Sequence, residues 1–182
     1  MLSIDGYGLL PVGRVGKTLL DAFDCGKPPL NAYLADSSTA MHQQRLGLTS
    51  VVFHENYPGP VGYFTLTNDS IPLKTSEVVD LGVEFALKAF PAVKIGRLAV
   101  SANLHGQGVG AAVMTLIVGE VLDSSSLSAA RLLVVDSDSD PAVIRFYEKQ
   151  GFELNLWAET QAKHHKGKGV QTVKMHRDIL RT

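Results

Sequence analysis

A glycine-rich turn at residues 105–110 has the residue types and spacing best suited to bind a ligand. The six residues read HGQGVG, between an apolar segment at 95–100 and an amphipathic segment that continues to about residue 122. Glycines let the backbone approach a ligand and take positive φ angles, and a helix behind them points its free N–H groups and positive dipole end at the same place. The order strand, turn and helix therefore predicts an anion site, and a pyrophosphate fits it.

The turn taken alone leaves two other interpretations open. Gly106, Gly108 and Ala111 fit the G-x-G-x-x-G/A fingerprint of dinucleotide-binding proteins, which needs an acidic residue about 20 positions later. The available residue, Asp136, comes 30 positions after Gly106, so the fit is poor. The turn could also join a strand to a helix without binding anything.

A second segment, at 140–152, has the signals of a complete helix. Asp140 is its expected N-cap, Pro141 its first residue and Gly151 its C-terminal stop. The two segments together resemble the GNAT N-acetyltransferase family, whose acetyl-CoA loop reads Q/R-x-x-G-x-G/A and whose following helix ends in Phe-Tyr-x-x-x-Gly-Phe. His105 stands at the Q/R position, a departure that affects a side-chain contact and leaves the backbone cradle intact. The resemblance covers about residues 45 to 180.

The resemblance implies which residues bind acetyl-CoA and which one acts in acetyl transfer. The backbone beside Leu98 and Val100 would pair with the pantetheine arm, and an amide near Val100 would polarise the thioester carbonyl. Tyr147 would protonate the departing thiolate, and Phe146 would be a core or cofactor-packing aromatic. The alternative for Tyr147 is a packed aromatic with its hydroxyl in solvent. The residues implied to bind the cofactor are Leu98, Ala99, Val100, His105, Gly106, Gln107, Gly108, Val109, Gly110, Ala111, Phe146 and Tyr147.

No general base stands out in the sequence. Glu55, Glu77 or a chain of waters would serve, and nothing selects among them. An α-amino group with a pKa of about 7.7 to 8.0 is partly neutral at pH 7, whereas a lysine amine near 10.4 must be deprotonated against roughly 3 kcal/mol more. A site without a strong base favours the α-amine. Arg97 alternates away from Leu98, so it faces the substrate side or balances the surface of the sheet.

A segment near the N-terminus imitates a phosphate-binding P-loop. Residues 11–18 end in Gly-Lys-Thr, and the apolar segment 132–135 followed by Asp136 resembles the strand that holds Mg²⁺ in such proteins. Pro11, however, replaces the first glycine of G-x-x-x-x-G-K-[ST], and proline removes an N–H from a loop that works by donating N–H groups. The sequence argues against an NTPase.

The elements that must position these residues follow from turn signals and hydrophobic periodicity. We expect helices around 14–22, 28–46 and 76–90, a helix from the glycine-rich turn to about 122, and a helix at 140–150. Strands are expected at 49–55, 61–68, 93–100, 131–136, 152–157 and 170–177. This order predicts one α/β domain over residues 1–182. The resemblance implies a mixed, mostly antiparallel central sheet, helices on both faces, and a cofactor cleft where the strands ending near Val100 and Asp136 diverge.

Bulk properties indicate a protein of ordinary single-domain size. The 182 residues contain no apolar run approaching the roughly 18 that a membrane span requires, and the first residues lack the basic region of a signal peptide. We therefore expect a cytoplasmic protein with no membrane partner. The single Cys25 cannot form an internal disulfide. The six histidines show no metal pattern, and His164 and His165 lie in a lysine-rich segment, 163–169, interpreted as a solvated loop.

The N-terminal part narrows the resemblance to the tRNA-acetylating toxins of bacterial toxin–antitoxin pairs. The segments that carry it are 23–34, the helix after it, 61–66 and 96–100. It implies aminoacyl-tRNA as the acceptor and a ribbon-helix-helix antitoxin as a partner. A homodimer is a further assembly that the sequence leaves open. Against it, 17 basic and 18 acidic side chains leave the chain near neutral, while tRNA binding is usually driven by a basic surface. Lys163, Lys166 and Lys168 are the expected local contacts with tRNA.

Two alternatives to the toxin remain open at this point. One is an acetyltransferase for a small-molecule amine or a protein N-terminus. The other is a non-catalytic acetyl-CoA-binding module, which the presence of Tyr147 disfavours.

Overall fold

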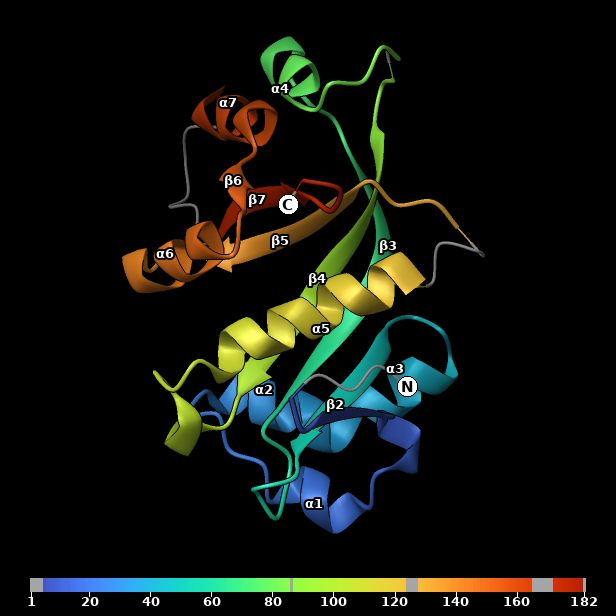
Figure 1. Cartoon of the computed structure of the whole chain (residues 1–182), viewed down its shortest axis with the longest axis vertical. Coiled ribbons are helices and arrows are strands. Elements are labelled where there is room, and N and C mark those ends of the chain that lie inside the picture. The colour runs from blue at the N-terminus through green and yellow to red at the C-terminus, as the bar shows by residue number, and fades with distance from the viewer. Residues whose placement is uncertain (1–4, 86, 124–127, 165–171, 182) are drawn as a thin grey trace. The chain divides into compact units, whose positions relative to one another are not determined.

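The computed structural model describes residues 5–85, 87–123, 128–164 and 172–181, and for residues 163 and 164 the backbone alone. The chain divides into two compact units (Figure 1). Unit 1 comprises residues 1–67 and 95–123, and unit 2 comprises residues 68–94 and 124–182.

Seven strands form the sheet of the described chain. They are β1 (Tyr7–Pro11), β2 (Leu48–His54), β3 (Gly62–Ile71), β4 (Phe90–Val100), β5 (Leu132–Asp138), β6 (Glu153–Leu154) and β7 (Thr172–Asp178). Their order is β1-β2-β3-β4-β5-β7-β6, and β3 and β4 each contribute residues to both units. The pairs β1–β2, β2–β3, β5–β7 and β6–β7 are antiparallel. The predicted mixed, mostly antiparallel α/β sheet is confirmed.

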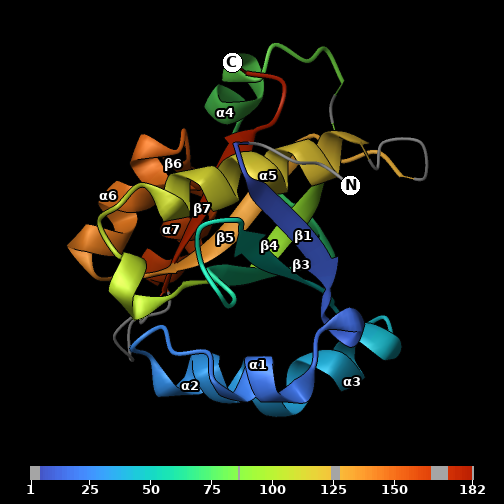
Figure 2. The same ribbon diagram turned by 60° about the horizontal axis from the view of Figure 1, so that its bottom comes forward.

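Unit 1 covers its strands with helices on both faces (Figure 2). One face carries η1 (Val12–Arg14), α1 (Lys17–Asp21), α2 (Pro28–Ala32), η2 (Tyr33–Ser37) and α3 (Ser38–Gln43), and the other carries α5 (Val109–Asp123), which follows the short η3 (Ala102–Leu104). The first face is apolar at its centre, where Phe23, Leu34, Val51, Tyr63 and Ala99 share one buried cluster. Burial of this cluster holds the N-terminal helices against the sheet.

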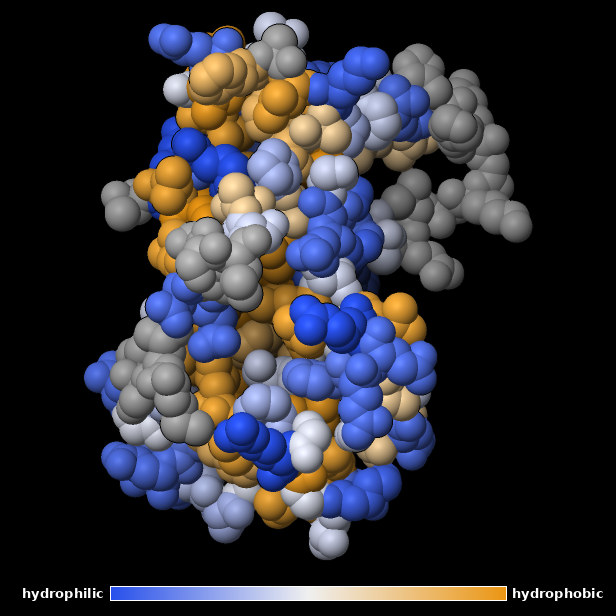
Figure 3. All heavy atoms as spheres, turned by 90° about the vertical axis from the view of Figure 1, so that its right-hand side faces the viewer, coloured by the Kyte–Doolittle hydropathy of each residue, from blue (hydrophilic) through white to orange (hydrophobic). Residues whose placement is uncertain are grey.

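Unit 2 contains α4 (Thr75–Asp80), α6 (Pro141–Lys149) and α7 (Leu156–His164) with β5, β6 and β7. Its core includes Ile71, Leu81, Phe90, Leu132 and Val134. Apolar side chains also reach the surface of this unit around α4, as Figure 3 shows. Those with large exposed fractions are Val79, Phe85, Leu87 and Leu180. No helix among the described residues is long and apolar enough to cross a membrane.

Several predicted boundaries are wrong. The helix expected at 76–90 ends at Asp80, because Gly82 takes a φ of 63° and stops it, and Phe90 already begins β4. The strand expected at 152–157 ends after two residues, because the Asn155 side chain accepts a hydrogen bond from Ala158 N at 2.7 Å and starts α7. The helix expected at 28–46 contains a π-helical turn at η2 and ends at Gln43.

Two elements were missed. β1 pairs along its length with β2, from Tyr7 opposite His54 to Pro11 opposite Ser50. α7 runs into the segment interpreted as a loop, so residues 163 and 164 are helical, while residues 165–171 lie outside the described part of the chain. Residues 170 and 171 of the strand predicted at 170–177 also lie outside the described part of the chain. The remainder of that strand is β7.

Candidate active site

The predicted anion turn of unit 1 has an open backbone. Gly106 and Gly108 have φ angles of 75° and 82°, in the left-handed region that side chains disfavour. A Cβ placed on either glycine would meet no other heavy atom within 4 Å. The positive φ angles of these glycines therefore serve a turn whose outer surface is free for a ligand.

Four backbone N–H groups at this turn have no acceptor. Those of Ala111 and Ala112 donate to the carbonyl of Gly108, at 3.0 and 3.1 Å, and close the first turn of α5. Within the described residues, no hydrogen bond is made by the N–H groups of Gly106, Gly108, Val109 and Gly110. Unsatisfied N–H groups at a helix N-terminus attract anions, because their partial charges and the helix dipole act in the same direction. The turn therefore fits a pyrophosphate such as that of acetyl-CoA.

Side chains of the turn hold it in place. The His105 imidazole donates from Nε2 to the carbonyl of Val100 at 2.9 Å, and Gln107 Nε2 donates to the carbonyl of Asn103 at 2.8 Å. Ser101 N donates to Val61 O at 2.9 Å and links the end of β4 to the start of β3. The His105 side chain therefore links the turn to the end of β4.

The other residues predicted to contact the cofactor in unit 1 lie on β4 and α5. Ala99 is buried in the core under the N-terminal helices, and Leu98 and Val100 are half-buried. Val109 is buried and Ala111 half-buried at the start of α5. In unit 1 the glycine turn, rather than these side chains, has N–H groups open to a ligand.

Tyr147 lies on α6 in unit 2, in an aromatic group. Its ring centre is 5.1 Å from that of Phe146 and 5.3 Å from that of Phe152, and 6% of the residue is exposed. Burial raises the pKa of Tyr147 to about 12, so the phenol keeps its proton at neutral pH. Such a group is suited to donate a proton and unsuited to remove one.

Both carboxylates considered as a base are placed by the structure. Glu55 is exposed. Glu77 is buried, and its two oxygens accept hydrogen bonds from Lys74 N at 2.7 Å and Leu156 N at 2.9 Å. Glu77 therefore stabilises the starts of α4 and α7.

Asp136, the acidic residue of both rejected nucleotide motifs, is engaged within unit 2. It forms ion pairs with Lys94 and with Lys174, the latter at 2.8 Å. Burial acts to raise the pKa of Asp136, but hydrogen bonds from Lys174 and Lys94 outweigh it and lower the pKa. The P-loop-like segment forms a short turn before the five-residue α1, where Lys17 pairs with Asp21. Asp136 is thus paired with lysines instead of serving as the acidic residue that either motif requires.

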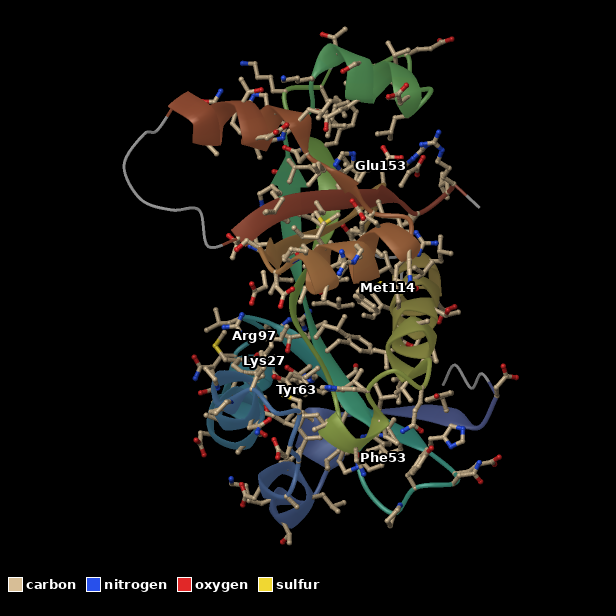
Figure 4. The ribbon with its side chains drawn as sticks, turned by 90° about the vertical axis from the view of Figure 1, so that its left-hand side faces the viewer. Lys27, Phe53, Tyr63, Arg97, Met114 and Glu153 are labelled. Atoms are coloured by element: carbon tan, nitrogen blue, oxygen red, sulfur yellow. The ribbon has the colours of Figure 1, made fainter. Side chains whose placement is uncertain are left out.

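Arg97 has a neighbour that the sequence did not indicate. Its guanidinium carbon lies 5.0 Å from the centre of the Tyr33 ring, in the π-helical turn η2. Figure 4 shows Arg97 and Tyr63 on the side of the strands that faces the N-terminal helices. The only sequence signal for this site was the alternation that turns Arg97 away from Leu98. The other predicted substrate residues are not placed, because the Lys163 side chain, Lys166 and Lys168 lie outside what the structure describes.

No group of three or more His, Cys, Asp or Glu side chains in the described residues could hold a metal ion.

Comparison with known proteins agrees with these features. A family model described as an acetyltransferase (GNAT) domain matches residues 59–154, which is 96 of the 182 residues and more than half of the chain. The chain therefore belongs to the GNAT acetyltransferase family and is an N-acetyltransferase. A search of curated protein sequences finds no significant match.

Solved structures share the fold over most of the chain. A bacterial toxin matches 94% of this chain and 91% of its own, with a TM-score of 0.74 and 16% identity. The structure of AtaT complexed with acetyl-methionyl-tRNAfMet matches 92% of this chain and 93% of its own, with a TM-score of 0.72 and 22% identity. A third structure is a tyrosine-to-phenylalanine mutant of AtaT bound to the C-terminus of the antitoxin AtaR and to acetyl-CoA. It matches 93% of this chain and 92% of its own, with a TM-score of 0.63 and 23% identity.

Proposed function

We propose that this acetyltransferase uses acetyl-CoA to acetylate the α-amine of aminoacyl-tRNA and acts as the toxin of a toxin–antitoxin pair. The main support for acetyl-CoA binding is the group of four unpaired N–H groups at residues 106–110. The acceptor is supported by the likeness in fold to AtaT, which was solved with acetyl-methionyl-tRNAfMet.

The proposed chemistry assigns two tasks to this chain. Acetyl-CoA supplies a thioester, whose carbonyl carbon an amine attacks and whose thiolate leaves. The N–H groups of Gly106, Gly108, Val109 and Gly110 bind the pyrophosphate, and the backbone of 98–100 aligns the pantetheine arm. Tyr147 holds a proton on its phenol oxygen and gives it to the leaving thiolate.

The positions of Glu55 and Glu77 bear on the choice of acceptor. Glu77 is engaged at two helix starts and Glu55 is exposed, so neither is a preorganised base. An α-amine with a pKa of about 7.7 to 8.0 needs little help to lose its proton at neutral pH. This favours an α-amine over a lysine side chain.

Labelled acetyl-CoA and bulk aminoacyl-tRNA test the proposal. The wild-type protein should place label in the RNA fraction, and Tyr147→Phe, which keeps the ring and its packing, should lower kcat by about 10² to 10⁴ with unchanged acetyl-CoA affinity. Expression of the wild type should arrest growth, and expression of the variant should be tolerated. A wild type that labels no RNA and is harmless would contradict the proposal; a near-normal kcat for the variant would assign Tyr147 to packing.

The near-neutral net charge of −1 favours a second candidate, an acetyltransferase for a small-molecule amine or a protein N-terminus. Labelling of such amines without labelling of RNA would select it. We further propose a single functional domain over residues 1–182, a homodimer, and a ribbon-helix-helix antitoxin as partner. The complex of AtaT with AtaR supports an antitoxin of some kind.

A further inference from the structure

Arg97 is a cation without a matching anion in its surroundings. Its Nη1 donates to the carbonyl of Gly96 at 2.6 Å, and within the described residues Nε and Nη2 make no hydrogen bond and no carboxylate pairs with the guanidinium. The residue is exposed although it covers the Tyr33 ring. Its remaining donors are therefore available for an external acceptor.

The Tyr33 ring under Arg97 is held by several contacts. The Tyr33 hydroxyl lies 3.3 Å from Thr65 Oγ1 and 3.5 Å from Thr49 Oγ1, and the two threonine oxygens are 2.8 Å apart. The Tyr33 ring also stacks on Tyr63, at 6.2 Å and an angle of 21°, and Tyr63 donates to Leu30 O at 2.8 Å. A guanidinium resting on an anchored ring loses little freedom when it binds.

The side chains of the cluster beneath Arg97 are uncharged. Thr49 and Thr65 are buried hydroxyls, and Tyr33 and Tyr63 are phenols, so none of these four offsets the charge of Arg97. Planar guanidinium groups recognise phosphate through paired N–H donors and stack on aromatic rings and bases. The chemistry of this cluster therefore suits a nucleotide better than a neutral amine.

The position of Arg97 relates this cluster to the proposed reaction. It lies three residues before Val100 on β4, about 10 Å along the strand, and its side chain leaves the face opposite to Leu98. We propose that Arg97, supported by Tyr33, binds a phosphate of the terminal nucleotide of the acceptor RNA and so selects a nucleic-acid-linked amine. This inference rests on the proposed function and adds a contact to its acceptor side.

Three variants test the contact against a matched control. Arg97→Gln removes the charge, Arg97→Lys keeps it without the planar pair of donors, and Arg14→Gln removes another exposed arginine of unit 1. With bulk aminoacyl-tRNA, Arg97→Gln should raise KM about tenfold with kcat nearly unchanged, and Arg97→Lys should fall between it and the wild type. Acetyl-CoA affinity should match the wild type in all three variants.

Binding of deacylated tRNA at several salt concentrations provides a readout that does not need turnover. Losing one phosphate contact should reduce the slope of log K against log salt by about 0.7 in Arg97→Gln and not in Arg14→Gln. A wild type that acetylates no RNA but binds it with this Arg97-dependent slope would overturn the proposed function and leave the contact standing. Equal KM and slope for Arg97→Gln and Arg14→Gln, or no RNA binding at all, would overturn the contact.

Discussion

The first N–H groups of α5 in unit 1 and of α6 in unit 2 differ in whether they have hydrogen-bond acceptors. At α6 the Asp140 side chain accepts from Ala142 N at 2.8 Å, its carbonyl accepts from Val143 and Ile144 N, and Pro141 has no N–H to satisfy. At α5 no described side chain caps the helix, and four N–H groups stay unpaired. At α6 the protein's own groups accept the described N–H hydrogen bonds of the first turn. At α5 the unpaired N–H groups are available to a ligand.

Selected charged side chains of the two units show the same contrast between paired and unpaired groups. In unit 2, Asp136 pairs with Lys94 and Lys174, and Arg131 makes a two-bonded ion pair with Asp178 at 2.7 and 2.8 Å. In unit 1, Arg97 rests on a neutral ring with donors to spare. The difference teaches that unpaired polar groups, rather than abundant ones, are the ones left available to bind another molecule.

The largest expected effect concerns the open turn. Gly108→Val should weaken acetyl-CoA binding at least about 100-fold, or about 2.7 kcal/mol, because the branched side chain fills the space that the phosphates need. Gly82→Val is the control, since Gly82 also has a positive φ, 63°, and open space around a Cβ. Both variants carry backbone strain. Isothermal titration should separate them, and equal affinities would place the cofactor elsewhere.

The paired and unpaired arginines should differ in stability. Arg131→Gln leaves Asp178, which is 13% exposed, without its partner and should lower the free energy of unfolding by about 2 kcal/mol, less than for a fully buried pair because Arg131 is 27% exposed. Arg97→Gln should change it by less than about 0.5 kcal/mol. Urea denaturation measures both, and a larger loss for Arg97→Gln would reverse the comparison.

His176 of unit 2 should give stability a pH dependence. Burial lowers its pKa below 6.5, although Glu77, Glu153 and Asp178 act to raise it. Its buried Nδ1 makes no hydrogen bond within the described residues and lies 3.9 Å from Glu77 Oε1. The unfolded chain then binds more protons, so stability is present above pH 6.5 and is lost as the pH falls towards the lower folded pKa. One proton limits the slope to about 1.4 kcal/mol per pH unit. His176→Gln should flatten this part of the stability curve, and an unchanged slope would exclude His176 as its cause.

The smallest effect concerns the completed helix start. Asp140→Ala removes the cap of α6 and should cost about 1 kcal/mol of stability while acetyl-CoA affinity stays the same. Thermal melting and isothermal titration measure the two quantities. Loss of affinity without loss of stability would mean that Asp140 serves the ligand rather than the helix.

Local signals predicted the parts of the molecule that depend on neighbours in sequence. The glycines of 105–110 and the pair Asp140 and Pro141 mark helix starts by their own backbone preferences, and both helices begin there. The helix expected at 76–90 was too long because the positive φ of Gly82 ends α4 after Asp80, and a single glycine among apolar residues did not signal that stop. Asn155 carried a cap signal for α7 that the apolar residues around it obscured.

The sequence by itself determined the GNAT fold, the glycine-rich turn with its positive-φ glycines and the proposed proton donor Tyr147, because each is marked by a short run of residues. Only the tertiary structure decided which polar groups are paired within the protein and which stay available. It pairs Asp136 with lysines from β4 and β7, engages Glu77 at two helix starts, and brings Arg97 over Tyr33, 64 positions earlier in the chain. Such partners are remote in sequence, and whether a charge or an N–H stays available to a ligand depends on what folding brings beside it.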